Sequence, residues 1–328
     1  MNIKKSVAEL VGNTPLVELS NFEKKHNLKA KIIGKLEFLN PSGSIKDRAA
    51  LAMIEDAQER GLLKEGSTII DATSGNTGIS LATMAATKGM KFEPYLEPGV
   101  TIERKQIFHA FGLKQHEFTE IPGLGNVEED GLVLEDLMAG LYKIAEEKNY
   151  FYINQTQNQI NQEAHYRTTG PEIWRDTDGK VDIFVALGGT AGTLVGTGRY
   201  LREKNPNVKI VGVQPHEDSR PEGENFTGHM IDGVLPLGRV EKQFIPPLIL
   251  KNLDNGFAFD EIIDIKAEDA FATARELTKT DGIFLGTSAA AAATAAKILA
   301  ERPENEGKNI VAIFADNGMK YLSTDMYK

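Results

Sequence analysis

Residues 181–193 of this chain are Val-Asp-Ile-Phe-Val-Ala-Leu-Gly-Gly-Thr-Ala-Gly-Thr. The segment 181–187 is a nearly continuous apolar run, which is typical of a β-strand buried on both faces. A loop of glycine and threonine follows, and a helical pattern begins at Thr193. A strand, a glycine-rich loop and a helix in this order predict one unit of a parallel, doubly wound α/β sheet.

The same order recurs along the chain, which extends the prediction to the whole protein. The alternation predicts an α/β fold, and the alanine-rich segment 289–296 predicts a tightly packed buried helix rather than a linker. Strands are predicted at 31–38, 67–72, 90–96, 181–187, 208–213 and 309–315. Helices are predicted at 45–60, 77–88, 128–147, 193–203, 267–280 and 289–300.

Length and composition narrow the class of protein. With 328 residues and 41% hydrophobic content, the chain has enough material for a sizeable core and for two domains. The 37 basic and 47 acidic residues give a net charge of −10, so we expect neither nucleic acid nor an anionic membrane surface as a partner. The chain has no cysteine, which excludes disulfides, zinc–thiolate sites and a cysteine nucleophile.

The sequence also favours a cytoplasmic location. No apolar run approaches the ~18 residues that a membrane helix needs. The lysines near the N-terminus are not followed by an apolar stretch, so we expect no signal peptide. His26, His109 and His116 show no ligand spacing, and we assign no metal site.

Lys46 stands where a lysine is unusual. Asn40-Pro41-Ser42-Gly43 is a turn sequence, and the lysine follows it at the start of a predicted helix. A cation is disfavoured at that end of a helix. The objection weakens if the amine is the imine nitrogen of a bound cofactor, whereas a solvated surface lysine is the alternative interpretation.

Three loops at strand-to-helix junctions offer groups that bind anions or polar ligands. Thr73-Ser74-Gly75-Asn76-Thr77-Gly78 exposes the N–H groups of a helix start, which suit a carboxylate. Gly188 to Thr193 combines successive N–H groups with threonine hydroxyls and forms a candidate phosphate cradle, although it matches neither a Walker loop nor a nicotinamide fingerprint. Ser288 follows Gly286-Thr287 and offers a hydroxyl for a pyridine-type nitrogen, or is simply a helix cap. In parallel α/β sheets such junctions gather at the carboxyl ends of the strands, where ligands bind.

With these motifs together, the sequence resembles the cysteine synthase and cystathionine β-synthase family of fold-type II enzymes, which use pyridoxal 5′-phosphate (PLP). Ser44-Ile45-Lys46-Asp47-Arg48 and Ser74-Gly75-Asn76-Thr77-Gly78 carry the resemblance most specifically. It begins at Val11-Gly12-Asn13-Thr14-Pro15-Leu16 and continues through Thr168-Thr169-Gly170-Pro171-Glu172-Ile173-Trp174 to Tyr321-Leu322-Ser323-Thr324. It implies the tryptophan synthase β-like fold, in which two doubly wound α/β domains hold the cofactor between them.

The resemblance also assigns roles to individual residues. Lys46 would be the Schiff-base lysine and the proton carrier at Cα. Asn76 would bond the 3′ oxygen of PLP, and Ser288 would face the pyridine nitrogen. The substrate carboxylate would be bound by Thr73, Ser74, Gly75, Thr77 and Gln155. The phosphate would be cradled by Gly189, Thr190, Ala191, Gly192 and Thr193.

A neutral serine at the ring nitrogen would favour α,β-elimination to an aminoacrylate. The glycine-rich wall Gly-Ile-Gly-Ala-Gly of the sulfhydrylases is replaced here by Met230-Ile231-Asp232-Gly233-Val234-Leu235-Pro236. The substitution places a carboxylate, Asp232, where it could act as a base on water or a thiol. We therefore predict β-elimination or β-replacement on a β-substituted alanine: L-cysteine would release hydrogen sulfide, and a second nucleophile would add, with water as the candidate that gives L-serine.

Several alternatives stay open. The enzyme could be an O-acetylserine sulfhydrylase, a serine or threonine dehydratase-like lyase, a nicotinamide-dependent dehydrogenase or a non-catalytic partner-binding protein on the same fold, and Asp232 could simply cap a turn. The resemblance implies a homodimer and makes the tail of a serine acetyltransferase a candidate partner. We expect a smaller, mobile domain at 41–153 and a larger PLP-binding domain at 1–40 plus 154–328.

Overall fold

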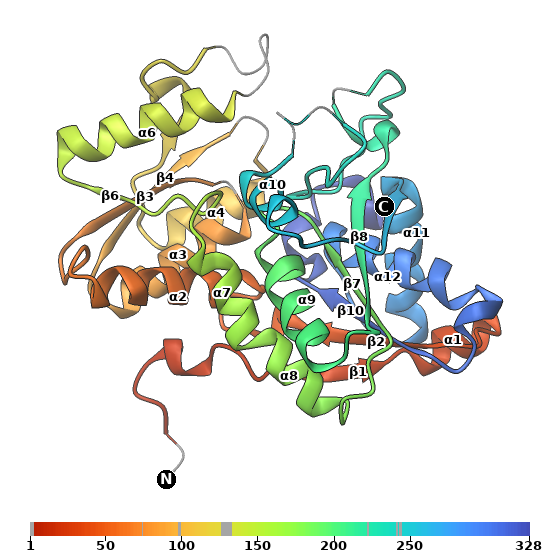
Figure 1. The fold of residues 1–328 in the computed structure, drawn as a ribbon. Coiled ribbons are helices and arrows are strands. Elements are labelled where there is room, and N and C mark those ends of the chain that lie inside the picture. The colour runs from red at the N-terminus through yellow and green to blue at the C-terminus, as the bar shows by residue number, and fades with distance from the viewer. Residues whose placement is uncertain are drawn as a thin grey trace.

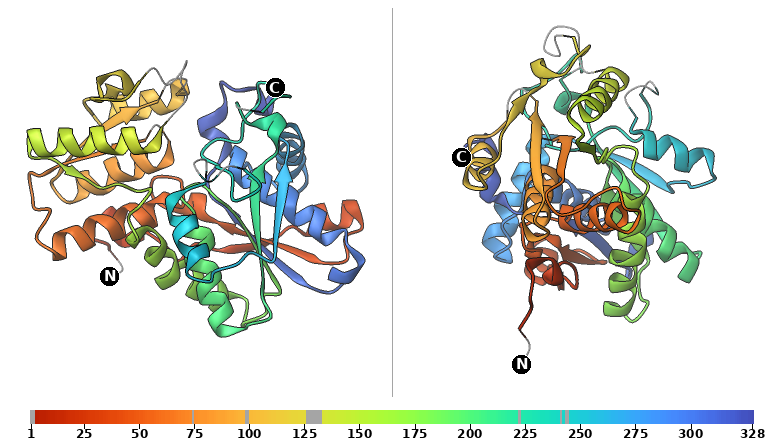
Figure 2. Two further views of the ribbon diagram at one scale, coloured as in Figure 1. Left: turned by 45° about the horizontal axis from the view of Figure 1, so that its top comes forward. Right: turned by 90° about the vertical axis from the view of Figure 1, so that its left-hand side faces the viewer.

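In the computed structural model, two separate β-sheets lie side by side, each with helices packed on its faces (Figure 1). The structure describes residues 3–73, 75–97, 100–125, 133–221, 223–240, 242 and 245–328. Figure 2 shows the same pair of sheet-and-helix units from two further sides. The smaller sheet uses strands between residues 68 and 152, and the larger sheet uses strands from both sides of that segment. The division into two α/β units with separate sheets agrees with the predicted fold class, whereas the domain boundaries themselves stay a prediction.

The larger sheet has six strands in the order β1-β2-β10-β7-β8-β9. Only β1 pairs antiparallel, and every other pairing is parallel. Its strands are β1 (Leu16–Glu18), β2 (Lys31–Leu36), β7 (Ile183–Leu187), β8 (Lys209–Pro215), β9 (Glu261–Ile265) and β10 (Asn309–Phe314).

The central strand β7 shows why both faces of this sheet are covered. Successive side chains of a strand point to opposite faces. Ile183 and Val185 pack into the cluster formed with α11 (Ala267–Thr280) and α12 (Thr287–Ala300). Phe184 and Ala186 pack into the opposite cluster, with α9 (Gly192–Lys204). A run that is apolar at nearly every position is therefore what this place in the sheet requires.

The smaller sheet has four parallel strands in the order β5-β4-β3-β6. Helices α2 and α3 cover one face through Ile69 and Phe92, and α6 covers the other through Ile70 and Tyr95. The strands are β3 (Thr68–Ala72), β4 (Lys91–Leu96), β5 (His116–Glu117) and β6 (Phe151–Tyr152). The helices are α2 (Lys46–Glu59), α3 (Asn76–Thr87), α4 (Ile102–Ala110) and α6 (Leu134–Lys148).

Every predicted strand and helix has a counterpart in the structure, with bounds within a few residues of the predicted ones. The helix expected at 128–147 is α6, which begins at Leu134, and residues 126–132 lie outside the described part of the chain. The sequence analysis did not predict β1, β5, β6 and β9, nor α1 (Ser20–His26), α4, α7 (Ile160–Arg167), α8 (Thr169–Asp176) and α10 (Pro247–Asp254). In the described residues no helix combines the length and the apolar character that a bilayer crossing requires.

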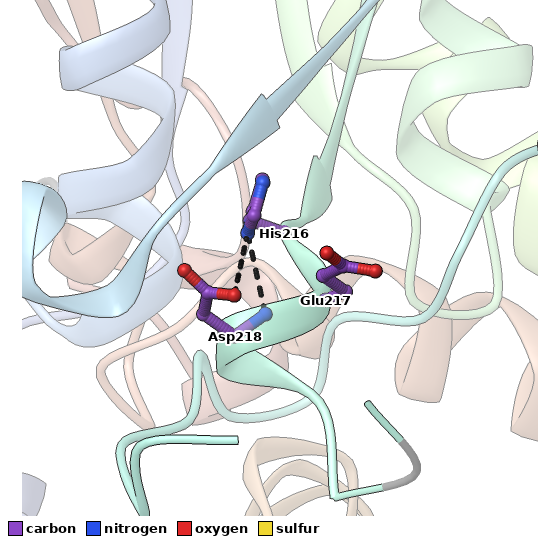
Figure 3. A group of neighbouring side chains, drawn as sticks. All are labelled: His216, Glu217 and Asp218. Atoms are coloured by element: carbon purple, nitrogen blue, oxygen red, sulfur yellow. Dashed lines mark hydrogen bonds and ion pairs between the residues drawn. The ribbon is translucent and has the colours of Figure 1, made fainter. Parts of the chain in front are cut away.

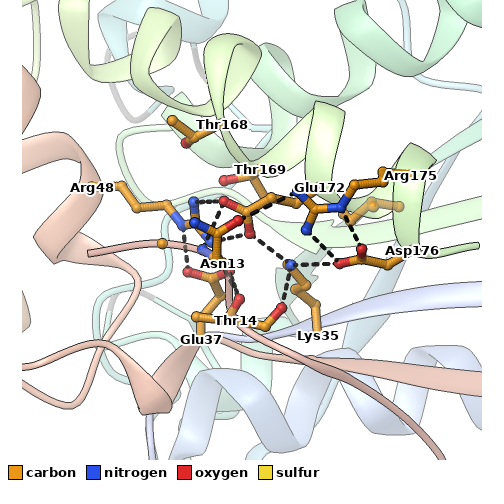
Figure 4. Close-up of polar contacts among 12 residues, drawn as sticks. Asn13, Thr14, Lys35, Glu37, Arg48, Thr168, Thr169, Glu172, Arg175 and Asp176 are labelled. Atoms are coloured by element: carbon orange, nitrogen blue, oxygen red, sulfur yellow. Dashed lines mark hydrogen bonds and ion pairs between the residues drawn. The ribbon is translucent and has the colours of Figure 1, made fainter. Parts of the chain in front are cut away.

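A buried cluster of charges ties α2 to the larger unit (Figure 4). We call Lys35, Glu37, Arg48 and Glu172 the buried charged cluster. Arg48 donates two hydrogen bonds of 2.7 Å to Glu172 and bonds of 2.8 and 2.9 Å to Glu37. Lys35 donates to Glu172 at 2.8 Å. Its two cations and two anions balance, and bidentate Arg–carboxylate pairs are strongly directional, so the cluster fixes the first turn of α2, which begins at Lys46.

Candidate active site

One cavity of about 320 Å³ lies where the two units meet. Its walls come from the loops after β3 and β7, from the starts of α2 and α12, and from the segment 232–235. The sequence-predicted residues that line it are Lys46, Thr73, Gly75, Asn76, Thr77, Gln155, Gly189, Thr190, Ala191, Gly192, Thr193, Asp232 and Ser288. Ser74, the remaining candidate, lies outside the described residues. The size suits a small organic ligand.

Lys46 begins α2; the N-cap residue Ile45 makes no side-chain hydrogen bond, and the N–H of Lys46 donates to Ser44 Oγ at 3.3 Å. Burial lowers the pKa of the Lys46 amine to about 8, although the carboxylate of Asp71 acts in the opposite direction. Because an amine reacts as a nucleophile only when it is deprotonated, this environment makes Lys46 far more reactive near neutral pH than a surface lysine.

Asp71 is a site residue that the sequence analysis missed. It lies in β3 and is 1% exposed, and its Oδ2 atom is buried without a hydrogen-bond partner. Burial raises the pKa of Asp71 to about 8, while the N–H groups of Gln155 and Ala72, and the charge of Lys46, lower it. Asp71 and Lys46 therefore influence each other through their charges.

The loop before α3 and the residue Gln155 form one corner of the cavity. The Thr77 hydroxyl donates to Gln155 Oε1 at 2.6 Å, and Gly78 N–H donates to Thr73 Oγ1 at 3.1 Å. Gly75 is the N-cap of α3 and has no side chain that could cap the helix, and a helix start of this kind favours an anion.

The loop from Gly189 to Thr193 forms the opposite wall and leads into α9, which also has no side-chain cap. A Cβ at Gly189 would lie 2.5 Å from the carbonyl oxygen of Gly233, so only glycine fits there. Asn161 donates to Thr190 Oγ1 at 2.8 Å. His165 Nε2 lies 3.2 Å from Thr193 Oγ1, and burial lowers the pKa of His165 well below its usual value, which keeps the imidazole neutral. Asn161 and His165 thus hold the loop in a fixed shape.

The third wall brings Ser288 and Asp232 together. Ser288 lies in the first turn of α12, whose N-cap is Gly286, so the alternative of a capping serine does not apply. The N–H of Asp232 donates to Thr287 Oγ1 at 3.1 Å, which anchors the Asp232 segment to the same turn. The side chain of Asp232 is 25% exposed and lines the cavity, which favours a role there over a solvent-facing turn cap.

Arg104, which the sequence analysis did not single out, faces Asp232 across the cavity. Its Nη2 lies 3.7 Å from Asp232 Oδ2, and its guanidinium carbon lies 5.1 Å from the centre of the Tyr321 ring. Burial raises the pKa of Asp232, Arg104 lowers it, and the charges of Asp316 and Glu97 raise it. Arg104 is therefore the cation that favours an ionised Asp232.

A second group of polar side chains has residue types that can bind a metal ion. In the described ranges, the ligand atoms of His216, Glu217 and Asp218 lie within 4.8 Å of one another (Figure 3). However, His216 Nδ1 accepts the N–H of Asp218 at 3.2 Å, and Lys266 Nζ lies 2.6 Å from Asp218 Oδ2. These partners occupy His216 Nδ1 and one oxygen of Asp218, so we assign no metal site to the group.

The residues around the cavity fit the cofactor that the family resemblance implies. An uncapped helix start behind a loop in which Gly189 and Gly192 admit no Cβ suits the phosphate, and a lysine of lowered pKa suits the aldehyde. Asn76 and Ser288 line the space between them and offer donors to ring atoms.

Comparisons with known proteins point the same way. The sequence model of the family described as "Pyridoxal-phosphate dependent enzyme" matches residues 7–316. A cysteine synthase of Aquifex aeolicus (strain VF5) is 40% identical over 327 residues, which cover 99% of this chain and 92% of that protein. The crystal structure of cysteine synthase from Entamoeba histolytica has a TM-score of 0.84 at 37% identity and covers 99% of this chain and 91% of its own. A hydrogen sulfide-producing enzyme from Fusobacterium nucleatum has a TM-score of 0.82 at 35% identity, with coverage of 98% and 99%.

Proposed function

Because this chain belongs to the cysteine synthase family of PLP-dependent enzymes, we propose that it converts L-cysteine and water to L-serine and hydrogen sulfide. The Cβ–S bond breaks and a Cβ–O bond forms, while the second proton of water leaves with the sulfide. The family chemistry, which acts on β-substituted amino acids, is shared with the cysteine synthases that the chain resembles. The choice of cysteine and water is our proposal.

The observation that carries this choice is the carboxylate of Asp232 in the cavity wall. A general base must lie within reach of the proton that it takes and must be ionised. Asp232 meets the first condition through its place in the wall. Burial raises the pKa of Asp232 above its usual value, which makes the carboxylate a stronger base, while Arg104 lowers the pKa and favours the ionised form. We assign to Asp232 the removal of a proton from the water that adds at Cβ.

The other residues bind and orient. PLP supplies an electron sink when it is bound. Lys46 holds the cofactor and moves the proton at Cα. The substrate carboxylate is bound by Thr73, Gly75, Thr77 and Gln155. The loop from Gly189 to Thr193 binds the phosphate. Asn76 and Ser288 contact the 3′ oxygen and the ring nitrogen. We carry Ser74 over only as a sequence-based assignment to the carboxylate site.

We expect Asp232→Asn to lower L-serine formation from L-cysteine by roughly 100- to 10,000-fold, the usual range for a lost general base. Sulfide release in the first turnover should persist, because Lys46 and the cofactor contacts are unchanged. Sulfide and serine are to be followed together in single and multiple turnovers. Asp269→Asn, which changes an exposed aspartate of α11, is the matched control. Equal serine yields from the Asp232 variant and wild type would contradict the assignment.

The reactivity of Lys46 should depend on pH in a predictable way. We expect the rate of PLP uptake by the apoprotein to rise with pH and to reach its midpoint near pH 8, because the amine must lose a proton before it reacts. Asp71→Asn removes a nearby negative charge that favours the protonated amine, so the midpoint should move to lower pH. Stopped-flow absorbance over a pH series measures both. A midpoint that stays above pH 10 in wild type would show that Lys46 is not desolvated.

An O-acetylserine sulfhydrylase is the second candidate, since the relatives described above are cysteine synthases. A product assay separates the two: cysteine, O-acetylserine and serine are each offered with and without sulfide. Serine and sulfide from cysteine alone support our proposal, whereas cysteine formed only from O-acetylserine and sulfide supports the alternative. A homodimer, a serine acetyltransferase tail as partner, a cytoplasmic location and a mobile domain at 41–153 stay predictions from the sequence.

A further inference from the structure

Lys320 is a buried cation beside the cavity to which the family chemistry above gives no role. It lies in the short 3-10 helix Gly318–Tyr321 near the C-terminus and is 6% exposed. Its ammonium group donates to Asn76 Oδ1 at 2.7 Å and to the carbonyl oxygen of Ser42 at 3.3 Å. A lysine from the last part of the chain thus contacts both the first residue of α3 and the turn that leads to Lys46.

The amide of Asn76 is held from two sides by groups of opposite kind. An ammonium group can only donate hydrogen bonds, so the atom facing Lys320 must be the amide oxygen. On the other side, the Asn76 NH₂ group donates to Asp316 Oδ2 at 2.8 Å. The Tyr321 hydroxyl donates to the same oxygen at 2.7 Å, which leaves that oxygen an acceptor.

Lys320 and Asp316 therefore determine the orientation of the Asn76 amide, because the positions of its oxygen and nitrogen must be assigned from their hydrogen-bond partners. One hydrogen of the NH₂ group is used by Asp316, and the other is left for a ligand in the cavity that Asn76 lines. With the amide reversed, the NH₂ group would face an ammonium ion and the oxygen would face a carboxylate. Both contacts would be repulsive.

We propose that Lys320 is a positioning residue that fixes the Asn76 amide with its NH₂ group toward the 3′ oxygen of PLP. The inference rests on the proposed contact between Asn76 and the cofactor. In addition, the contact between Asn76 and the cofactor would depend on Lys320, a cation from the C-terminal segment. The same cation joins Asn76 to the turn before Lys46. Burial lowers the pKa of Lys320, and so does the nearby cation Arg104, while the anions Asp316 and Asp47 raise the pKa and favour the charged form.

The test measures PLP affinity and the visible spectrum of the bound cofactor. Lys320→Met removes the donor at similar length and should weaken PLP binding by about tenfold, the effect of one lost charged hydrogen bond. It should also shift the absorbance of the lysine-bound cofactor. Lys320→Arg, which keeps a donor, should restore both. Lys308→Met is the control, because Lys308 donates at 2.9 Å to the Oδ1 of another asparagine, Asn305, in a turn that does not line the cavity.

A cycle with Asn76→Ala separates positioning from general destabilisation. If Lys320 acts through Asn76, Lys320→Met has no further effect on affinity or spectrum in the Asn76→Ala background. An equal loss in both backgrounds, with matching loss of apoprotein thermal stability, would overturn the proposal in favour of a purely structural role. Asn76→Ala binding PLP like wild type, with an unchanged spectrum, would instead refute the Asn76 contact on which the inference rests.

Discussion

The Lys46→Ala variant is expected to fold, to bind no covalent cofactor and to lose activity by roughly 100- to 10,000-fold or more, because nucleophile and general base are lost together. The fold should survive, since Lys46 pays a desolvation cost that alanine avoids: burial is what lowers its pKa to about 8. Absorbance of the purified protein, and mass spectrometry after borohydride reduction, measure the covalent link. Circular dichroism measures the fold.

The matched control is Lys64→Ala, which removes an exposed lysine between α2 and β3 and should retain the reducible link. The result that contradicts the assignment is a Lys46→Ala protein in which borohydride still traps the cofactor on another lysine. A wild-type protein that takes up no PLP would contradict the cofactor assignment as a whole. The two results are distinct, because only the first leaves PLP bound.

The strands and helices that were predicted are those whose own residue pattern indicates their structure. The strand β7 is apolar at nearly every position because helices cover both of its faces, and that pattern is visible in the sequence. The alanines of α12 are buried almost without exception because the helix packs between α11 and the sheet, so small residues are needed throughout. A strand or helix that is buried on all sides can therefore be recognised from its own apolar or small residues, without knowing which elements pack against it.

The elements that were missed depend on their partners instead. The strands β5 and β6 have two residues each, too few for any periodicity, and exist because β4 and β3 lie beside them. The polar segment after residue 154 forms α7 and α8, which the sequence analysis did not predict. Its buried Asn161 and His165 contact Thr190 and Thr193 around the start of α9, so these polar residues depend on a partner elsewhere in the chain.

The candidate site shows the same division. Motifs at strand-to-helix junctions located the residues on three walls of one cavity, since the carboxyl ends of parallel strands converge. Arg104 and Lys320 could not be found in this way, because each acts on a residue far away in the sequence: Arg104 on Asp232, and Lys320 on Asn76. Asp71 did leave a signal: an acidic residue within the apolar strand Thr68–Ala72 is costly unless it has a function there.

Glu172→Gln is expected to lower the free energy of unfolding by roughly 3–5 kcal/mol at neutral pH, the usual effect of breaking a buried ion pair. Glu172 is 6% exposed and accepts hydrogen bonds from both Arg48 and Lys35, so the substitution leaves two buried cations with one anion, Glu37, in the buried charged cluster. Glu163→Gln is the matched control, because its ion pair with Arg199 is partly exposed and should contribute less than about 1 kcal/mol. Urea denaturation measures both.

The stability difference between wild type and Glu172→Gln should itself depend on pH. Burial would raise the pKa of Glu172, but the hydrogen bonds and charges of Arg48 and Lys35 outweigh it and lower the pKa from 4.5 to about 2. A carboxylate whose pKa is lower in the folded state stabilises the protein by about 3 kcal/mol above the pKa of the unfolded chain. That contribution is lost as the pH falls from about 4.5 to about 2. Unfolding curves in this range should therefore converge for the two proteins, and a constant difference down to pH 2 would mean that Glu172 stabilises by packing and not by charge.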